Sequence, residues 1–117
     1  MIVQKFSIDD AMFERSPGQE VDVFVGNLLD ERHGGPITVA YGRYGPNQSL
    51  AFTLAVDDVM VVLEGPLSVS MGGGVVTAGP GEIVYMPKGE AVTIRSHDEG
   101  AVTAAVTHPH WRAASAT

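Results

Sequence analysis

The sequence predicts an all-β protein built from short antiparallel strands. Apolar and β-branched segments follow one another closely, and Gly, Pro, Asn or Asp bound each of them. No helical pattern long enough for a crossover lies between these segments, so neighbouring strands are expected to pair antiparallel. A chain of this kind closes into a β-sandwich or a β-barrel.

The first expected strand begins at residue 21. The expected strands span residues 21–25, 37–44, 49–54, 59–63, 67–71, 75–77, 83–86, 91–96 and 101–107. The run 59–63 is apolar on both faces of its pleat. One face should therefore point into the barrel, and the other should be covered by a second sheet or a partner subunit. On this basis we expect a homodimer.

One short helix is expected before the strands. Ser7 can cap it, Asp10 follows three residues later, and residues 11–15 continue the pattern until Pro17 and Gly18 stop it. A helix this short, at the start of the chain, is expected to be peripheral to the fold.

Length and composition narrow the class of protein. A chain of 117 residues is the size of one domain, so we expect a single domain over residues 1–117. Cysteine is absent, which excludes disulfides and thiolate chemistry. The seven basic residues are scattered and the net charge is −7, so no nucleic-acid partner is expected. With no membrane-spanning run and no signal peptide, we expect no membrane partner and a cytoplasmic location.

Two turn-bounded segments carry a family resemblance. The first is an apolar strand that ends in Leu-Glu-Gly at residues 63–65, and the second contains Gly81, Pro87 and Gly89. At this spacing they resemble the two sequence motifs of the cupin superfamily. The resemblance implies a single-domain cupin, an RmlC-like antiparallel β-barrel or jelly roll.

A more specific resemblance rests on three further segments. These are Asp-Asp-Val at residues 57–59, Pro-Lys-Gly at 87–89 and the closing Val-Thr-His-Pro-His-Trp at 106–111. Together they are similar to the cupin domain of ethanolamine utilisation protein EutQ. The similarity covers residues 37–111, which is most of the chain.

The resemblance also locates the positions where a typical cupin holds a metal ion. Counted from Gly65, the Glu position holds Asp58, and the paired His positions fall within residues 51–54, which contain no histidine. The third His position holds Val92. One carboxylate does not hold a transition metal tightly, so we expect no metal and no other cofactor.

Asp58 is the leading catalytic candidate. Asp57 and Asp58 are adjacent on a strand, so their side chains point to opposite faces. An inward Asp58 beside the expected substrate-binding residues Phe52 and Met60 would be desolvated and its pKa raised, which suits a general acid or base. In the alternative interpretation, Asp58 hydrogen-bonds a nearby Arg or backbone amide and only shapes the barrel.

Three further residues are candidates on neighbouring strands. Arg43 and Tyr44 alternate, so one of them must face inward. An inward Arg43 would bind a carboxylate or phosphate of a substrate, whereas an inward Tyr44 would donate a hydrogen bond or relay a proton. Tyr85 is a third catalytic candidate. Packing at the barrel rim is an equal alternative for each.

The four histidines are weighed in the same way. His33 lies in a polar loop that could fold over the barrel mouth, and it is a catalytic candidate beside the alternative of a solvated loop residue. His108 is a candidate substrate-binding residue, although His108 and His110 flank Pro109 in a segment expected to end the barrel. His97 lies in an expected hairpin turn and is given no role.

Two classes of function follow. The first is a metal-independent isomerase, lyase or cyclase that binds a small-molecule substrate in the barrel. The second is a noncatalytic metabolite-binding or EutQ-like accessory protein. The resemblance also implies a nucleotide-dependent activity. The sequence shows no recognisable phosphate loop, which argues against it. An unconventional iron site from Asp58, His33 and His108 is the remaining alternative.

Overall fold

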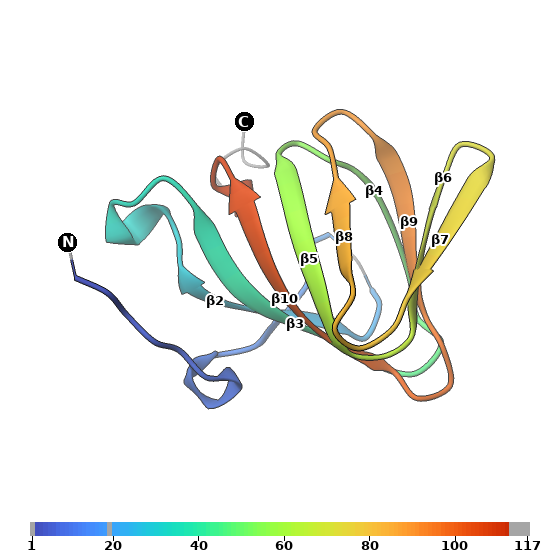
Figure 1. Ribbon diagram of the computed structural model, residues 1–117, viewed down its shortest axis with the longest axis horizontal. Coiled ribbons are helices and arrows are strands. Elements are labelled where there is room, and N and C mark those ends of the chain that lie inside the picture. The colour runs from blue at the N-terminus through green and yellow to red at the C-terminus, as the bar shows by residue number, and fades with distance from the viewer. Residues whose placement is uncertain (1, 19, 113–117) are drawn as a thin grey trace.

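The computed structural model describes residues 2–18 and 20–112, which fold into two antiparallel β-sheets facing each other (Figure 1). The larger sheet has six strands in the order β1 (Glu14–Arg15), β2 (Val23–Leu29), β3 (Thr38–Tyr44), β10 (Ala101–His108), β5 (Asp57–Glu64) and β8 (Ile83–Met86). The smaller has four, in the order β4 (Ser49–Thr53), β9 (Ala91–Ser96), β6 (Leu67–Met71) and β7 (Gly74–Ala78). The arrangement is a jelly roll, which confirms the predicted fold class.

All nine predicted strands are present, and β6, β8 and β9 have the predicted bounds. The largest difference is in β2, which continues to Leu29 instead of ending at Val25. Its backbone pairs with β3 as far as Leu29, with a bulge between Asn27 and Leu29. The ladder to β3 therefore carries the strand past Gly26, a residue that by itself favours a break.

The predicted N-terminal helix is wrong. Only one 3-10 turn forms, η1 (Ile8–Asp10), where the backbone N–H of Ser7 donates to the Asp10 carboxylate over 2.7 Å. The chain is extended from Ala11 onward, and β1 pairs with the edge of β2. Pairing with a sheet edge outweighs weak local helix propensity in so short a segment.

Gly26 allows the N-terminal segment to pack closely on β2. A Cβ atom at this position would lie 2.6 Å from the Cβ of Ala11, which is closer than two carbon atoms can approach. A second 3-10 turn is η2 (Glu31–His33), and no helix within the described residues is long and apolar enough to cross a membrane.

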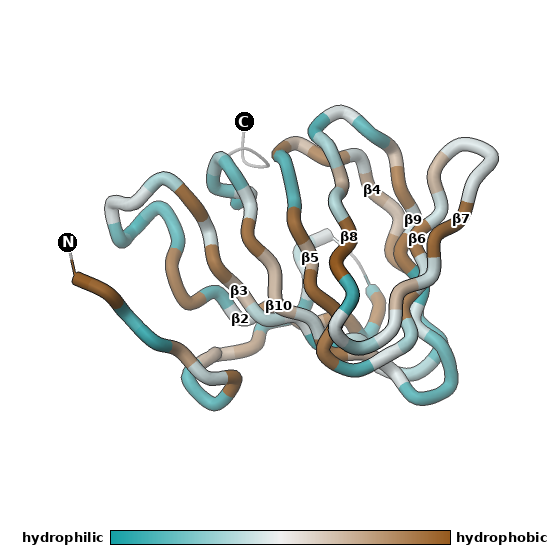
Figure 2. Tube along the Cα trace, in the orientation of Figure 1, coloured by the Kyte–Doolittle hydropathy of each residue, from teal (hydrophilic) through white to brown (hydrophobic). Residues whose placement is uncertain are grey.

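The side chains between the two sheets divide into a packed core and a cavity. On β5, Asp58, Met60 and Val62 alternate inward, whereas Val59 and Leu63 point outward. Residues of β5, β6, β8 and β9 fill the core. Figure 2 shows hydrophobic segments along β5 and β8, and a hydrophilic turn at residues 97–100. Toward β2, β3 and β4 the same interior opens into the cavity.

Candidate active site in the barrel

A cavity of about 270 Å³ lies between the sheets, lined from β2, β3, β4, β5 and β10 and the segment after β4. This volume is just below the range of roughly 300–1,000 Å³ that holds drug-sized ligands. Most of the wall is aliphatic or aromatic. Among the described residues that line it, there is no Lys, Arg or His. The cavity therefore suits a small, largely apolar molecule.

Asp58 is the ionisable carboxyl group in this wall. It points inward beside Met60, and the structure gives its buried Oδ1 atom no hydrogen-bond partner among the described residues. Burial raises the pKa of Asp58 from 3.8 to about 6. No Arg side chain or backbone amide of the described residues therefore donates to this oxygen, as the alternative interpretation would require. The carboxyl can take up or release a proton near neutral pH.

A row of polar side chains crosses the inner face of the large sheet at Asp58. Thr107 on β10 lies directly opposite Asp58, and Thr38 on β3 lies directly opposite Thr107. Thr107 Oγ1 is buried and has no hydrogen-bond partner among the described residues. Thr38 Oγ1 lies 2.8 Å from Nδ1 of His110, and His110 Nε2 lies 2.7 Å from the carbonyl oxygen of Gly35. Because a carbonyl oxygen can only accept, His110 donates from Nε2 to Gly35, and its Nδ1 atom pairs with the Thr38 hydroxyl.

The alternation on β3 decides between Arg43 and Tyr44. Tyr44 faces the cavity, whereas Arg43 faces outward with its guanidinium 4.6 Å from the ring centroid of Phe13. Burial, and then the negative charge of Asp58, raise the pKa of Tyr44 well above its ordinary value. Tyr44 consequently stays a neutral phenol, which can donate a hydrogen bond but cannot act as a base near neutrality.

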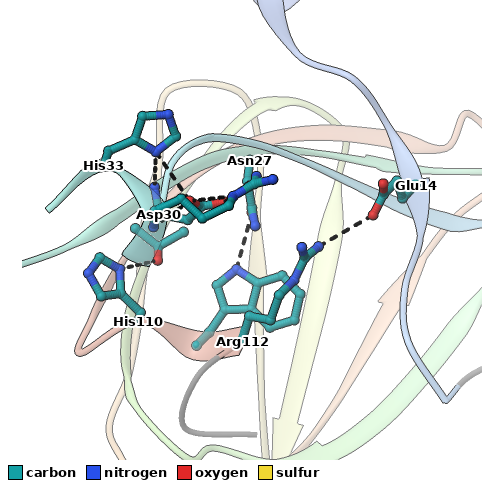
Figure 3. A network of polar contacts seen from close by, with 9 residues as sticks. Glu14, Asn27, Asp30, His33, His110 and Arg112 are labelled. Atoms are coloured by element: carbon teal, nitrogen blue, oxygen red, sulfur yellow. Dashed lines mark hydrogen bonds and ion pairs between the residues drawn. The ribbon is translucent and has the colours of Figure 1, made fainter. Parts of the chain in front are cut away.

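The segment after β10 supplies another part of the wall. Trp111 lines the cavity, and its indole N–H donates to Oδ1 of Asn27 over 3.2 Å. Arg112 donates to the Glu14 carboxylate over 3.4 Å, as Figure 3 shows together with the bond between His110 and Thr38. This segment is therefore fastened to β1, β2 and β3, which holds the Trp111 ring in place.

Four of the predicted site residues do not line the cavity: Arg43, Tyr85, His33 and His108. Tyr85 is 60% exposed on the outer face of β8, because it alternates with the inward Val84 and Met86. His33 lies in η2, where its ring contacts Asp30 (Figure 3). His108 is exposed at the end of β10. The cavity is lined by the other four predicted site residues: Asp58, Tyr44, Phe52 and Met60.

The described donor set does not fit a metal ion. Residues 51–54 and Val92, where the resemblance places the family's histidine ligands, include no His, Asp or Glu. Within residues 2–18 and 20–112, no three His, Asp or Glu side chains gather as a metal would require. The alternative site from Asp58, His33 and His108 does not assemble, since neither histidine lines the cavity.

Sequence reasoning missed Trp111 and the cavity threonines, three of which lie on β3 and β10. Thr38, Thr103 and Thr107 all face inward, at alternate positions of β3 and β10. Thr103 and Thr107 are an even number of residues apart, so the alternation along a strand already placed both on one face. Thr103 also requires Gly42 opposite, where a Cβ would lie 2.6 Å from the Thr103 hydroxyl. No pattern in the sequence shows that Trp111 turns back into the wall.

This two-sheet jelly roll shares its fold with solved cupin structures. The family profile of ethanolamine utilisation protein EutQ matches residues 20–112. The chain therefore belongs to the EutQ family. No protein of curated function matches it.

Three solved structures illustrate the similarity. A structural-genomics protein of unknown function from Rhizobium leguminosarum bv. viciae 3841 is 64% identical, with 94% of this chain and 100% of that chain covered and a TM-score of 0.80. The putative ethanolamine utilization protein Q of Salmonella typhimurium LT2 is 25% identical, with 84% and 79% covered and a TM-score of 0.77. The polyketide cyclase RemF of Streptomyces resistomycificus shares the fold, at 21% identity, 92% and 80% coverage and a TM-score of 0.76.

Proposed function

We propose that the barrel binds a small, largely apolar molecule and that Asp58 transfers a proton on it without a metal ion. The observation that carries this proposal is the buried, unpartnered Oδ1 of a carboxyl group whose pKa is raised to about 6. A general base is most effective when its pKa lies near the working pH. The same carboxyl, once protonated, is the acid for the return step.

The chemistry follows from the groups in the wall. Ionised Asp58 removes a proton from a carbon next to a carbonyl, and the electron pair of the broken C–H bond passes into an enolate. Where the enolate is conjugated with a C=C bond, the protonated carboxyl returns the proton to the far carbon of that bond, which shifts the double bond and gives isomerisation. Expulsion of a leaving group gives elimination instead, and attack of the enolate on a second carbonyl gives cyclisation. The Tyr44 phenol remains available as a hydrogen-bond donor.

Metal independence has its own support. The described residues of the lining include one carboxylate and no imidazole, a donor set too small for a transition metal. The fold that this chain shares with a polyketide cyclase is compatible with cyclase-type chemistry.

Carbon-acid exchange tests the proposal before the natural substrate is known. The ketone 2-tetralone is incubated with the protein in D₂O, and NMR follows deuterium entering the carbon positions beside the carbonyl. The wild type should accelerate exchange over buffer. Asp58→Asn should lose roughly 100-fold or more of that acceleration, as removal of a general base does. Asp57→Asn is the matched control, because Asp57 is the adjacent carboxylate on the outer face.

The alternative function is noncatalytic binding of a metabolite, in the manner of an accessory protein. One observation favours it: in the described cavity wall, Asp58 has no second residue beside it that titrates near neutral pH. Tetralone that binds without exchanging faster than in buffer would favour this alternative over catalysis.

We also propose that two copies of the chain associate through the outer face of β5, β8 and β10. Val59, Leu63, Ile83 and Val106 expose between 38% and 65% of their surface there. These strands are neighbours in one sheet, so the residues form one continuous apolar face that a symmetric dimer can cover. A cytoplasmic location and the lack of nucleic-acid and membrane partners stay predictions from the sequence.

A further inference from the structure

Two polar atoms in the cavity wall lack hydrogen-bond partners among the described residues, and they belong to facing residues. Asp58 Oδ1 is an acceptor on β5, and Thr107 Oγ1 carries both a donor and acceptor sites on β10. Directly opposite residues of an antiparallel pair have Cβ atoms roughly 4.5–5.5 Å apart. Both residues line the cavity, and although each of these atoms is covered in the ligand-free structure, rotation of the two side chains would bring both within reach of one ligand group.

The charge of the wall limits which ligand group that can be. The described lining contains no Lys, Arg or His to receive an anion, and Asp58 itself becomes negative when ionised. A ligand carboxylate or phosphate would be desolvated next to a like charge, which opposes binding in a site of low dielectric constant. The natural ligand should therefore carry no negative charge.

The hydrogen-bonding capacity of the pair favours a hydroxyl over an ammonium group. A hydroxyl donates one hydrogen bond, which Asp58 Oδ1 can accept, and it accepts one, which the Thr107 hydroxyl can donate. An ammonium group brings three donors and no acceptor, so the Thr107 hydroxyl would keep its proton unpaired. Full desolvation of a cation is repaid only when all its donors find partners.

We infer that the cavity recognises a small, uncharged, largely apolar alcohol or enol, whose hydroxyl bridges Asp58 Oδ1 and Thr107 Oγ1. This inference rests on the proposed function, since it takes the barrel interior as the ligand site. An enol is the form that proton transfer on a ketone would generate there, so the bridge would hold the reacting oxygen.

Four compounds with one ring system test the inference: 2-tetralol, tetralin, 2-aminotetralin and tetralin-2-carboxylate. Trp111 is the single tryptophan of the chain and lines the cavity, so its fluorescence reports binding directly. Calorimetry supplies the dissociation constants. At neutral pH, 2-tetralol should bind about tenfold or more tighter than tetralin, which is what a hydrogen bond to a charged group contributes. The carboxylate should bind more weakly than tetralin.

Two variants separate the bridge from general packing. Thr107→Val keeps the shape of the side chain and should remove most of the preference for 2-tetralol over tetralin. Thr93→Val removes a hydroxyl from the alternate, outward-facing register of β9 and should leave the preference unchanged.

The outcomes keep the inference and the proposed function apart. Equal binding of 2-tetralol and tetralin, or tightest binding of the amine or the carboxylate, would overturn the hydroxyl bridge and leave the barrel as the ligand site. Absence of binding for all four compounds would overturn both. Preference for 2-tetralol without exchange of 2-tetralone would support the bridge and contradict catalysis.

Discussion

Asp58 on β5 and Thr107 on β10 face each other across two hydrogen-bonded strands, and each holds a buried polar atom without a partner. Roughly 90% or more of buried polar groups in folded proteins are hydrogen-bonded, so exceptions call for an explanation. Here both exceptions border one cavity. The proposed ligand site offers an explanation, because a bound ligand would supply the missing partner to both groups.

Replacing Asp58 should stabilise the protein at alkaline pH. Its pKa is about 6 in the folded state against 3.8 ordinarily, so the folded state binds the proton more tightly. The free energy of unfolding is therefore highest below about pH 4 and decreases as the pH rises through about 6. Asp58→Asn should raise the free energy of unfolding by about 3 kcal/mol at pH 8 and change it little at pH 4.

Urea unfolding at both pH values measures this difference. Asp57→Asn serves as the control, because Asp57 lies on the outer face, where its carboxylate accepts from Tyr85 and the backbone of Lys88. An Asp58→Asn protein no more stable than the wild type at pH 8 would contradict the desolvated carboxyl.

Thr107→Val should stabilise the ligand-free protein by about 1 kcal/mol. The buried hydroxyl has no partner among the described residues, so its desolvation is uncompensated, and the valine methyl group removes that cost. The free energy of unfolding in urea is the measurement, with Thr93→Val for comparison. Destabilisation by Thr107→Val would indicate that the hydroxyl is satisfied in solution.

Asp30→Ala should destabilise the turn that precedes β3. The Asp30 side chain is fully buried and accepts hydrogen bonds from the backbone and guanidinium groups of Arg32. The Arg32 hydrogen bond holds the pKa of Asp30 well below its usual range, so this stabilisation is present above the ordinary Asp pKa and is lost in acid. We expect a loss of about 2 kcal/mol at neutral pH.

Thermal or urea unfolding checks the Asp30 prediction. Glu31→Ala, at an exposed position in the same turn, is the control and should change stability little. Equal stability of the two variants would mean that the Asp30 contacts contribute nothing measurable.

Protein purified without a tag or metal resin should contain no stoichiometric transition metal. The reason is that the cavity offers one carboxylate and no histidine in its described wall. Elemental analysis after gel filtration measures the content, and the tetralone exchange rate should be unchanged by a chelator. One iron, manganese, nickel or zinc per chain would contradict the metal-independent proposal.

Ile83→Glu should convert a dimer into monomers. Ile83 is 65% exposed within the proposed dimer face, and a buried, unpaired carboxylate there would oppose association. Val75→Glu is the control, since Val75 is 68% exposed on β7 of the other sheet. Light scattering measures the mass. A monomeric wild type, or dissociation by Val75→Glu alone, would rule out the proposed face.

Much of the fold could be predicted because its signals are local. The turn residues and the alternation of apolar residues placed all nine predicted strands, and three of these have the observed bounds. The inward orientation of Asp58 followed from the same alternation together with the family resemblance. These features depend on the pleat and on turn geometry, which a short segment determines for itself.

The tertiary structure decided what local signals could not. Residues 11–15 are extended instead of helical, because the edge of β2 offers their backbone partners. Alternation required one of Arg43 and Tyr44 to face inward, but only the closed sheet determined that it is Tyr44. The pairing of Thr107 with Asp58, and the return of Trp111 to the cavity wall, join residues about fifty positions or more apart. Such contacts arise from strand register and packing, which no single segment of the sequence contains.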